Sequence, residues 1–185
     1  MIKRCAGAGA IALAVLIAQP AAAATITIHT ERSGDTIDIH ASVILNADGA
    51  TAWRVLTDYN RYPEFIPDLR LSRIISRDHD TVMVEQSGIA SIWLIRIPLD
   101  ITFEIDEKPP DRLLSHAVAG SLRALASSYA LSKAAAGVRL DYVGHIAPGY
   151  ALFGRIEQSA VEQNVARQFK ALADEIDRQS AVLPK

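Results

Sequence analysis

The chain has 185 residues, 50% of them hydrophobic, and a formal net charge of -2. This length favours a single domain that can bury a sizeable core. The near balance of charge gives no electrostatic reason to expect nucleic acid or an anionic membrane surface as a partner. We therefore expect no nucleic-acid partner.

The first 24 residues have the order of a secretory signal peptide. Two basic residues precede the apolar run 11–18, and small residues follow it up to Ala24. The apolar run is well short of the ~20 residues that a spanning helix needs, so we expect no stable membrane span after cleavage. The single cysteine, Cys5, would be removed with the signal. We predict cleavage near Ala24, a periplasmic or secreted protein, and one domain over residues 25–185.

A β-hairpin is predicted at the start of the mature chain. Residues 26–45 alternate in polarity around Ser33-Gly34, where glycine supplies the positive φ of a two-residue turn. Asn46 or Asp48 then caps a short helix that continues to Leu56.

Residues 56–67, LTDYNRYPEFIP, hold two prolines and three aromatic rings. Pro63 and Pro67 rule out one continuous helix and force the chain to turn. The rings of Tyr59, Tyr62 and Phe65 either plug the core or contact a ligand, and the sequence leaves both readings open.

Alternating polarity returns after this segment and predicts a long antiparallel meander. Strands are expected over residues 69–76, 81–87, 90–107, 112–119, 125–133 and 138–146. In the long strand 90–107, one face should carry Leu99, Ile101, Phe103 and Ile105 and the other face Asp100, Thr102, Glu104 and Asp106. This pattern is typical of a strand with one buried and one wet face.

The last predicted element is a helix from about Leu152 to Arg178. Its apolar residues recur at steps of three and four, namely Phe153, Ile156, Ala160, Val165, Phe169, Leu172 and Ile176. The element order therefore predicts an α+β protein in which one large helix lies on a curved sheet.

Several spaced motifs resemble a known family. They are residues 52–67, RLSRIISRD (70–78), VMVEQSG (82–88), EKPP (107–110) and VRLDY (138–142). Together they closely resemble the polyketide cyclase/dehydrase group of the START-like (SRPBCC) superfamily, which includes coenzyme Q-binding START-domain proteins.

The resemblance implies a helix-grip fold, with a sheet of about seven antiparallel strands around the long C-terminal helix and two short helices after the first long strand. Residues 56–67 would join those short helices and lie over the mouth of a groove. Two features depart from the family: Tyr129 stands where many members carry tryptophan, and the strand at 26–30 looks like an addition.

The sequence offers no clear catalytic centre, and the catalytic residues stay unassigned. It has no HExxH, CxxC, P-loop or GxSxG motif. Its histidines, at 29, 40, 79, 116 and 145, form no i,i+2 or i,i+4 pair, so we expect no metal and no cofactor. The acids Glu104, Asp106 and Glu107 are expected on a solvated face. Glu85 is a better candidate for a partly buried carboxylate, although an exposed or ion-paired Glu85 is the more typical reading.

A groove between helix and sheet could bind an apolar ligand. The candidate ligand-binding residues are Trp53, Tyr59, Tyr62, Phe65, Trp93, Phe103, Tyr129, Tyr142, Phe153, Ala160, Val165 and Phe169. A fully packed core would use the same residue types, so the sequence cannot separate an open cavity from a filled one.

Three functions follow from these observations. The first is an extracytoplasmic binding or carrier protein for a lipophilic small molecule such as a quinone, an isoprenoid or a fatty-acid-like lipid. The second is a cyclase- or dehydratase-like enzyme acting on a polyketide-like substrate, which a buried, pKa-shifted His116 or Glu85 facing the cavity would favour. The third is an interaction module, since some members of the superfamily act on ribosomes, but a signal peptide would remove the ribosome from reach. The oligomeric state is left open.

Overall fold

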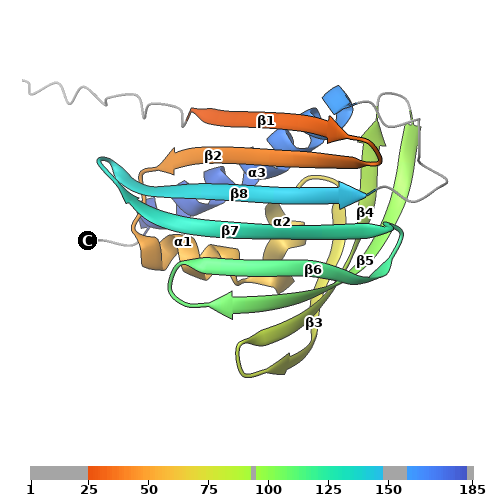
Figure 1. Ribbon diagram of the computed structural model, residues 1–185. Helices are drawn as coiled ribbons and strands as arrows, with labels where there is room; N and C mark the ends of the chain where they lie inside the picture. The colour runs from red at the N-terminus through yellow and green to blue at the C-terminus, as the bar shows by residue number, and fades with distance from the viewer. Residues whose placement is uncertain (1–24, 93–94, 148–157, 183–185) are drawn as a thin grey trace, which may run out of the picture.

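The computed structural model describes residues 25–92, 95–147 and 158–182. These residues form one eight-stranded sheet, a long C-terminal helix that lies against it, and a group of short helices after the second strand (Figure 1). The segment predicted to be a signal peptide lies outside the described residues, and so do Trp93 and Phe153. The α+β helix-grip architecture expected from the sequence is confirmed.

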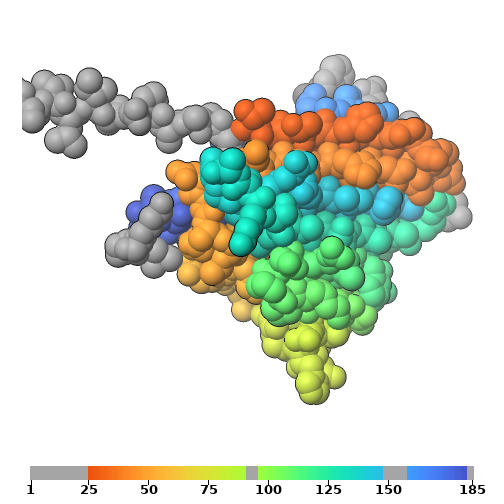
Figure 2. Space-filling model, turned by 60° about the vertical axis from the view of Figure 1, so that its left-hand side comes forward, coloured from red at the N-terminus to blue at the C-terminus, as the bar shows by residue number. Residues whose placement is uncertain are grey.

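All neighbouring strands in the sheet are antiparallel, in the order β1-β2-β8-β7-β6-β5-β4-β3. Only the β2–β8 pair joins segments that are distant in sequence, and it places the second strand beside the last one. The strands are β1 (Ile26–Ser33), β2 (Thr36–Leu45), β3 (Leu69–Asp78), β4 (Thr81–Ile92), β5 (Ile95–Lys108), β6 (Arg112–Gly120), β7 (Ala124–Ala134) and β8 (Gly137–Ala147). Figure 2 shows the β3–β4 hairpin projecting from the body of the molecule.

The first hairpin corrects two expectations. The sheet has eight strands where about seven were expected, and the edge strand β1 is the segment that the sequence marked as an addition. Ser33 pairs with Thr36, so the turn consists of Gly34 and Asp35, one residue later than predicted. Gly34 has a φ of 55°, which is the left-handed conformation that glycine adopts without steric cost.

The single strand predicted over residues 90–107 is wrong. The structure has two strands there: β4 continues to Ile92, β5 begins at Ile95, and these two residues pair. The run ASIWLIRI (90–97) contains no Gly, Pro, Asn or Asp, so nothing in it signals a reversal of the chain. The predicted faces of β5 are nevertheless correct from Leu99 to Ile105, because alternation does not depend on where a strand begins.

Helix α1 (Gly49–Leu56) begins at Asp48, whose carboxylate accepts a hydrogen bond from the Thr51 N–H at 2.7 Å. A short 3-10 turn, η1 (Tyr59–Arg61), and the one-turn helix α2 (Tyr62–Phe65) follow. Both elements lie within residues 56–67, the segment that holds two prolines and three aromatic rings.

Aromatic contacts hold the joint between α1 and α2. The rings of Tyr59 and Tyr62 meet edge to face with centroids 5.8 Å apart, and those of Tyr62 and Phe65 meet at 5.6 Å. The Tyr62 hydroxyl donates a hydrogen bond to the Leu56 carbonyl oxygen over 2.7 Å, which ties α2 back to the end of α1. The rings therefore fix the angle between the two short helices.

Helix α3 (Gln158–Val182) lies across the concave side of the sheet. It contacts β1 and β2 at one end of the strand order and β4 near the other end, so the sheet curls around it. Phe169, Leu172 and Ile176 are buried, as the helical period predicted. No helix in the part of the chain that the structure describes is long and apolar enough to cross a membrane.

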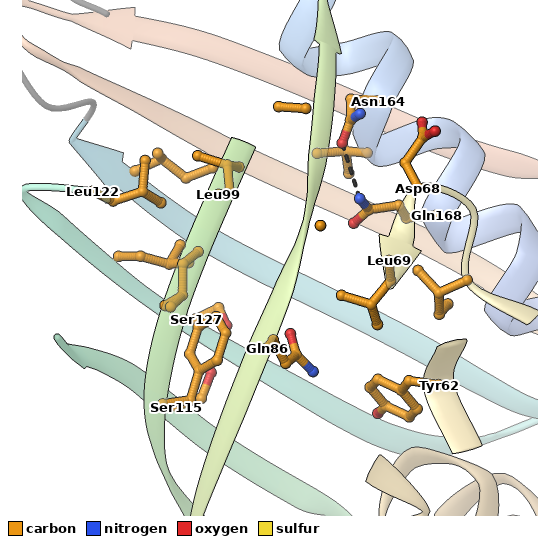
Figure 3. Close-up of a pocket in the computed structure, with 18 of the residues that line it drawn as sticks. Tyr62, Asp68, Leu69, Gln86, Leu99, Ser115, Leu122, Ser127, Asn164 and Gln168 are labelled. Carbon is orange, nitrogen blue, oxygen red and sulfur yellow. Dashed lines mark hydrogen bonds between the residues drawn. The ribbon is translucent and has the colours of Figure 1, made fainter. Parts of the chain in front are cut away.

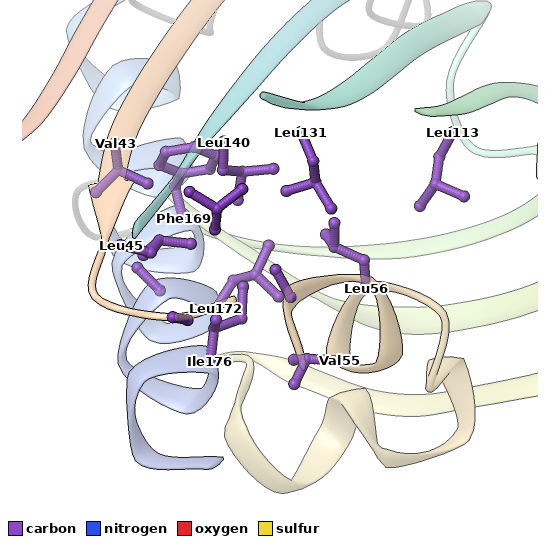
Figure 4. Packing of buried hydrophobic residues seen from close by; sticks show 14 of the residues in the cluster. Val43, Leu45, Val55, Leu56, Leu113, Leu131, Leu140, Phe169, Leu172 and Ile176 are labelled. Carbon is purple, nitrogen blue, oxygen red and sulfur yellow. The ribbon is translucent and has the colours of Figure 1, made fainter. Parts of the chain in front are cut away.

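The packed core lies where α1 and the C-terminal half of α3 meet β2 and β8 (Figure 4). Leu45, Leu140 and Ile176 are fully buried there, with 0% of their surface exposed. Burying a side chain of this size contributes roughly 1.5–3 kcal/mol to folding. This half of the interior is closed by its own side chains.

Candidate ligand-binding cavity

The other half of the interior encloses a cavity of about 310 Å³. This volume is near the lower end of the roughly 300–1,000 Å³ that small-molecule sites span. The cavity lies between the concave faces of β4 to β8, the helix α3, and the η1–α2 joint. It is therefore the groove between helix and sheet in which a ligand was expected.

Strand β5 supplies the most regular wall of the cavity. Its inward residues Ile97, Leu99, Ile101, Phe103 and Ile105 all line the cavity, and the residues between them do not. Because side chains alternate along a strand, an uninterrupted apolar series with a period of two produces one continuous apolar surface.

Helix α3 supplies the opposite wall. Ala160, Val161, Val165, Phe169 and Leu172 line the cavity at helical spacing. Ala160 and the valines are small, so this end of the helix leaves space where larger side chains would fill it. Towards the C-terminal end, the larger Phe169 and Leu172 close the cavity against the packed core.

The structure brings together most of the residues singled out as ligand contacts. Those that line the cavity are Tyr59, Tyr62, Phe103, Tyr129, Tyr142, Ala160, Val165 and Phe169. Trp53 and Phe65 instead pack against the core cluster and do not line the cavity. Trp93 and Phe153 lie outside the described residues. Contact of any of these residues with a ligand stays a prediction.

Hydroxyl groups gather on the β6–β8 wall of the cavity. The Oγ atoms of Ser115 and Ser127 are 2.7 Å apart, Tyr142 also lines the cavity, and the rings of Tyr129 and Tyr142 have centroids 4.8 Å apart. A Cβ atom at Gly144 would lie 2.5 Å from the Tyr142 hydroxyl oxygen, so only glycine at this position lets the ring lie against β8.

Burial raises the pKa of the phenol groups of Tyr59, Tyr62, Tyr129 and Tyr142. The physical cause is the loss of water around a phenolate in an apolar surrounding. All four side chains are therefore neutral at physiological pH, and they can donate or accept hydrogen bonds but cannot serve as bases.

Glu107 corrects the expectation of a solvated acid. It is buried, with 8% of its surface exposed. The Tyr59 hydroxyl donates to its Oε1 over 3.1 Å, and Arg77 binds both carboxylate oxygens at 2.8 and 3.1 Å. Glu107 lies two residues after Ile105 on β5, so both side chains point to the same face. This alternation predicts the burial of Glu107, but the adjacent turn at 109–111 made an exposed acid look more plausible. The network attaches η1 to the sheet.

A polar group of side chains lies on the α3 side of the cavity. Asp68, which follows α2, lines the cavity together with Asn164 and Gln168 of α3. In Figure 3 these three labelled residues lie near the helix, and Ser115 and Ser127 lie on the opposite wall. Sequence reasoning missed all three polar residues, because Asp68 sits in a turn and the two amides interrupt an apolar helix face.

The acid–base candidates lie elsewhere. The His116 side chain is 56% exposed and stands 3.6 Å from Glu104. Glu85 forms an ion pair with Arg73 at 2.6 Å, which is the more typical of the two outcomes considered for it. Neither His116 nor Glu85 lines the cavity. Among the described residues, no three His, Cys, Asp or Glu side chains are grouped in a way that could hold a metal ion.

Known structures share this fold across most of the chain. A STAR-related lipid transfer protein from Xanthomonas axonopodis has a TM-score of 0.68 at 18% identity, covering 86% of this chain and 96% of its own. The Zhui aromatase/cyclase from Streptomyces sp. R1128 has a TM-score of 0.61 at 14% identity, covering 78% and 95%. A START superfamily protein from Mycobacterium smegmatis has a TM-score of 0.57 at 12% identity, covering 82% and 100%. No curated protein matches the sequence.

The family model described as polyketide cyclase / dehydrase and lipid transport matches residues 45–169. The matched region begins at the end of β2 and ends within α3, so it includes every described residue that lines the cavity except Leu172. It also covers all the motifs that carried the resemblance in the sequence. The chain belongs to the polyketide cyclase / dehydrase and lipid transport family.

Proposed function

We propose that this protein binds and carries a lipophilic small molecule, of the lipid, quinone or isoprenoid kind, outside the cytoplasm. The observation that carries the proposal is the cavity of about 310 Å³ between α3 and the sheet, walled by the apolar faces of β5 and α3. An apolar wall with a few fixed polar groups is the usual form of a small-ligand site. The Xanthomonas protein of the same fold is named as a lipid transfer protein, which adds support by analogy.

The extracytoplasmic location rests on the first 24 residues alone, with their basic, apolar and small-residue order. N-terminal sequencing of the protein from its own cells tests it. We expect a mature chain that begins within a few residues of Thr25. Recovery of soluble protein that still begins at Met1 would contradict the location and leave the binding proposal standing.

A second candidate is a cyclase- or dehydratase-like enzyme that acts on a polyketide-like substrate in the same cavity. The observation in its favour is the set of hydroxyl groups of Ser115, Ser127 and Tyr142 that line the cavity, which could orient the carbonyl groups of such a substrate. The aromatase/cyclase among the similar folds supports it by analogy. Against it stand His116 and Glu85, the acid–base groups considered for it, which do not line the cavity.

Mass spectrometry of organic extracts separates the two candidates. Protein purified from its own cells is extracted, and the same protein is incubated with the extracted compound. A carrier returns the compound unchanged, whereas an enzyme converts it into a product of different mass or connectivity.

A pair of matched variants tests whether the ligand occupies this cavity. Ala160→Phe places a ring into the cavity from α3, whereas Ser159→Phe adds the same ring at the neighbouring exposed position. A ligand that binds only the folded state adds about 2.7 kcal/mol at a hundredfold excess over Kd, which should raise the melting temperature by several degrees. We expect Ala160→Phe to abolish this increase and Ser159→Phe to keep it. An increase that survives in both variants would place the ligand elsewhere.

A further inference from the structure

Two buried polar atoms at the cavity have no hydrogen-bond partner. They are the carboxylate oxygen Oδ2 of Asp68 and the amide nitrogen Nδ2 of Asn164. Both residues line the cavity. Buried donors and acceptors are almost always paired, because an unpaired one loses its bonds to water and gains nothing in exchange. Asn164 Nδ2 therefore lacks a partner within the protein, and Asp68 Oδ2 has an ion pair but no hydrogen-bond donor, so both atoms can bind a ligand group at the cavity.

Each of these two side chains has one neighbouring contact from α3. Gln168 Nε2 donates to Asn164 Oδ1 over 3.0 Å, so the carboxamide oxygen is satisfied and the NH2 group is not (Figure 3). Arg167 Nη2 lies 3.2 Å from Asp68 Oδ2, close enough for an ion pair but without the geometry of a hydrogen bond. This ion pair also places Asp68 beside the turn of α3 that carries Asn164.

Backbone contacts also hold Asp68 in place. Its φ is 66°, a left-handed conformation that Asp tolerates better than most residues. Its carbonyl oxygen accepts a hydrogen bond from the Ile89 N–H at 2.9 Å. A Cβ atom at Gly88 would lie 2.6 Å from that oxygen, so β4 approaches this closely only because residue 88 is glycine. These contacts thus position the carboxylate at the cavity.

We propose that Asp68 and Asn164 recognise a hydroxyl-bearing polar end of the apolar ligand. A hydroxyl donates one hydrogen bond and accepts others, so it can donate to Asp68 and accept from Asn164. An ether oxygen can only accept, and it would give Asp68 Oδ2 no hydrogen-bond donor. The inference rests on the proposed function, since it assigns the head group of the molecule that occupies the cavity.

Charge at the cavity favours the same choice. Of the described residues that line it, Asp68 is the only Asp or Glu, and none is Lys, Arg or His. Arg167 is already engaged with Asp68, and its side chain is 49% exposed. A ligand carboxylate would bring a second negative charge next to Asp68, and the two like charges would repel each other. Among the ligand classes considered, the site therefore selects a neutral alcohol over a fatty acid.

Displacement of the neutral dye Nile red from the purified protein tests the inference. The competitors are 1-dodecanol, dodecyl methyl ether and dodecanoate, which share one chain and differ in the polar end. We expect the alcohol to bind at least about tenfold more tightly than the ether or the carboxylate, as one charge-assisted hydrogen bond gained or lost implies.

Two variants assign this preference to residues. Asp68→Asn keeps a residue that tolerates the left-handed backbone and removes the charge, so the gap between dodecanol and dodecanoate should narrow about tenfold. Asn164→Leu removes the NH2 group at similar volume and should weaken dodecanol binding about tenfold. The matched controls Asp174→Asn and Gln163→Leu change exposed residues of α3 and should leave all three affinities unchanged.

The outcomes separate the head-group inference from the proposed function. Equal binding of all three compounds, or tightest binding of dodecanoate, overturns the head-group inference while the cavity remains a ligand site. An alcohol preference that persists in both variants overturns the assignment to Asp68 and Asn164. If neither Nile red nor any competitor binds or raises the melting temperature, the proposed function fails and the inference fails with it.

Discussion

Asp48 begins helix α1, and its charge gives that helix a dependence on pH. Hydrogen bonds from the Thr51 backbone N–H and the Thr51 hydroxyl hold the pKa of this carboxyl below its ordinary value. A lowered pKa in the folded state means that the carboxylate stabilises the fold above its unfolded pKa, and that this stability is lost as the pH falls through the folded pKa. The contribution of Asp48 to stability is therefore lost below about pH 4.

We expect Asp48→Ala to reduce the free energy of unfolding by about 1 kcal/mol at pH 7, the usual cost of removing an N-cap. Asp48→Asn should keep most of the cap, because its side-chain oxygen can still accept from Thr51. Urea unfolding at pH 7 and at pH 3 measures both effects. The difference between wild type and Asp48→Asn should shrink or reverse at pH 3, and a difference that grows on acidification would contradict the role of the charge.

Glu107 is the buried acid on which the position of η1 depends. Replacing it by alanine removes the acceptor of the buried Tyr59 hydroxyl and the partner of Arg77. We expect Glu107→Ala to lower the free energy of unfolding by about 2 kcal/mol, since the Tyr59 donor is left unpaired while Arg77, with 42% of its side chain exposed, regains water. Urea denaturation measures the loss.

Tyr59→Phe separates the hydrogen bond from the packing of the ring. In the Glu107→Ala background, Tyr59→Phe should lower the free energy of unfolding by less than it does in the wild type, because the hydroxyl has already lost its acceptor. The control Glu104→Gln changes an acid of β5 on the opposite face, with 40% of its side chain exposed, and should shift stability by less than about 0.5 kcal/mol. Equal costs for Glu107→Ala and Glu104→Gln would show that the buried network contributes no stability.

Single residues also show where sequence reasoning ends. Ile101, Phe103 and Ile105 were predicted to face inward because an alternating series fixes the face of each member. Glu107 continues that series, but a charged residue before two prolines reads as the start of a turn. Asp68 gave no signal at all, because its place at the cavity depends on the approach of β4 at Gly88, which is a contact between distant parts of the chain.

Helix α3 serves both as part of the core and as a wall of the cavity, and Phe169 marks the change between the two. Its side chain is 3% exposed, it lines the cavity, and its ring centroid lies 6.5 Å from that of Tyr142. Phe169→Ala should lower the free energy of unfolding by about 3 kcal/mol, because lost ring contacts and added empty volume both destabilise the fold. Urea denaturation of the ligand-free protein measures this change.

The neighbouring variant Lys170→Ala provides the comparison. Lys170 is exposed and pairs with Asp174 one turn along, and such a pair contributes about 0.3–0.5 kcal/mol. A loss below about 1 kcal/mol for Phe169→Ala would place that ring at a surface that is already open, and the division of α3 into a core half and a cavity half would then be wrong.

Elements with a clear period were predicted well, and reversals without turn residues were not. The buried face of α3 follows from apolar residues at three- and four-residue steps, and the faces of β8 follow from Val138, Leu140 and Tyr142. The reversal between Ile92 and Ile95 went unnoticed because a continuous apolar run looks the same in one long strand and in two paired strands. In the first hairpin, Gly34 located the turn to within one residue.

The interior of the whole molecule is divided between a filled region and an empty one. Leu172 and Ile176 of α3 pack with α1 and β2 in the closed core, whereas the start of α3 faces the cavity. The sequence could not reveal this division, since Leu, Ile, Val and Phe line both regions. The difference lies in the distance between α3 and the curved sheet, which depends on all the strands together.

Polar contacts attach α3 to the rest of the protein along its length. Gln158 donates to the Thr30 carbonyl oxygen of β1, Arg167 pairs with Asp68 beside the cavity, and Asp177 accepts from the Asn46 N–H at 3.1 Å. Near the cavity these contacts lack a packed apolar layer beneath them, whereas near Asp177 they lie over the core. Because packing supplies most of the free energy that opposes local opening, the cavity half of α3 should open more readily than the core half.

Native-state hydrogen exchange measures this difference directly. In the ligand-free protein, we expect the amides of residues 162–168 to exchange at least about tenfold faster than those of residues 172–178, since fewer buried contacts must break for them to open. A ligand in the cavity at a hundredfold excess over its Kd should slow the first group by up to about a hundredfold, because their opening would release it. The difference in exchange rate between the two groups of amides should then narrow or close.

The variant Ala160→Phe should show this smaller difference in exchange rate without any ligand, because its ring fills the same space. Equal exchange in the two halves of α3 before ligand is added would contradict an empty cavity beneath the helix.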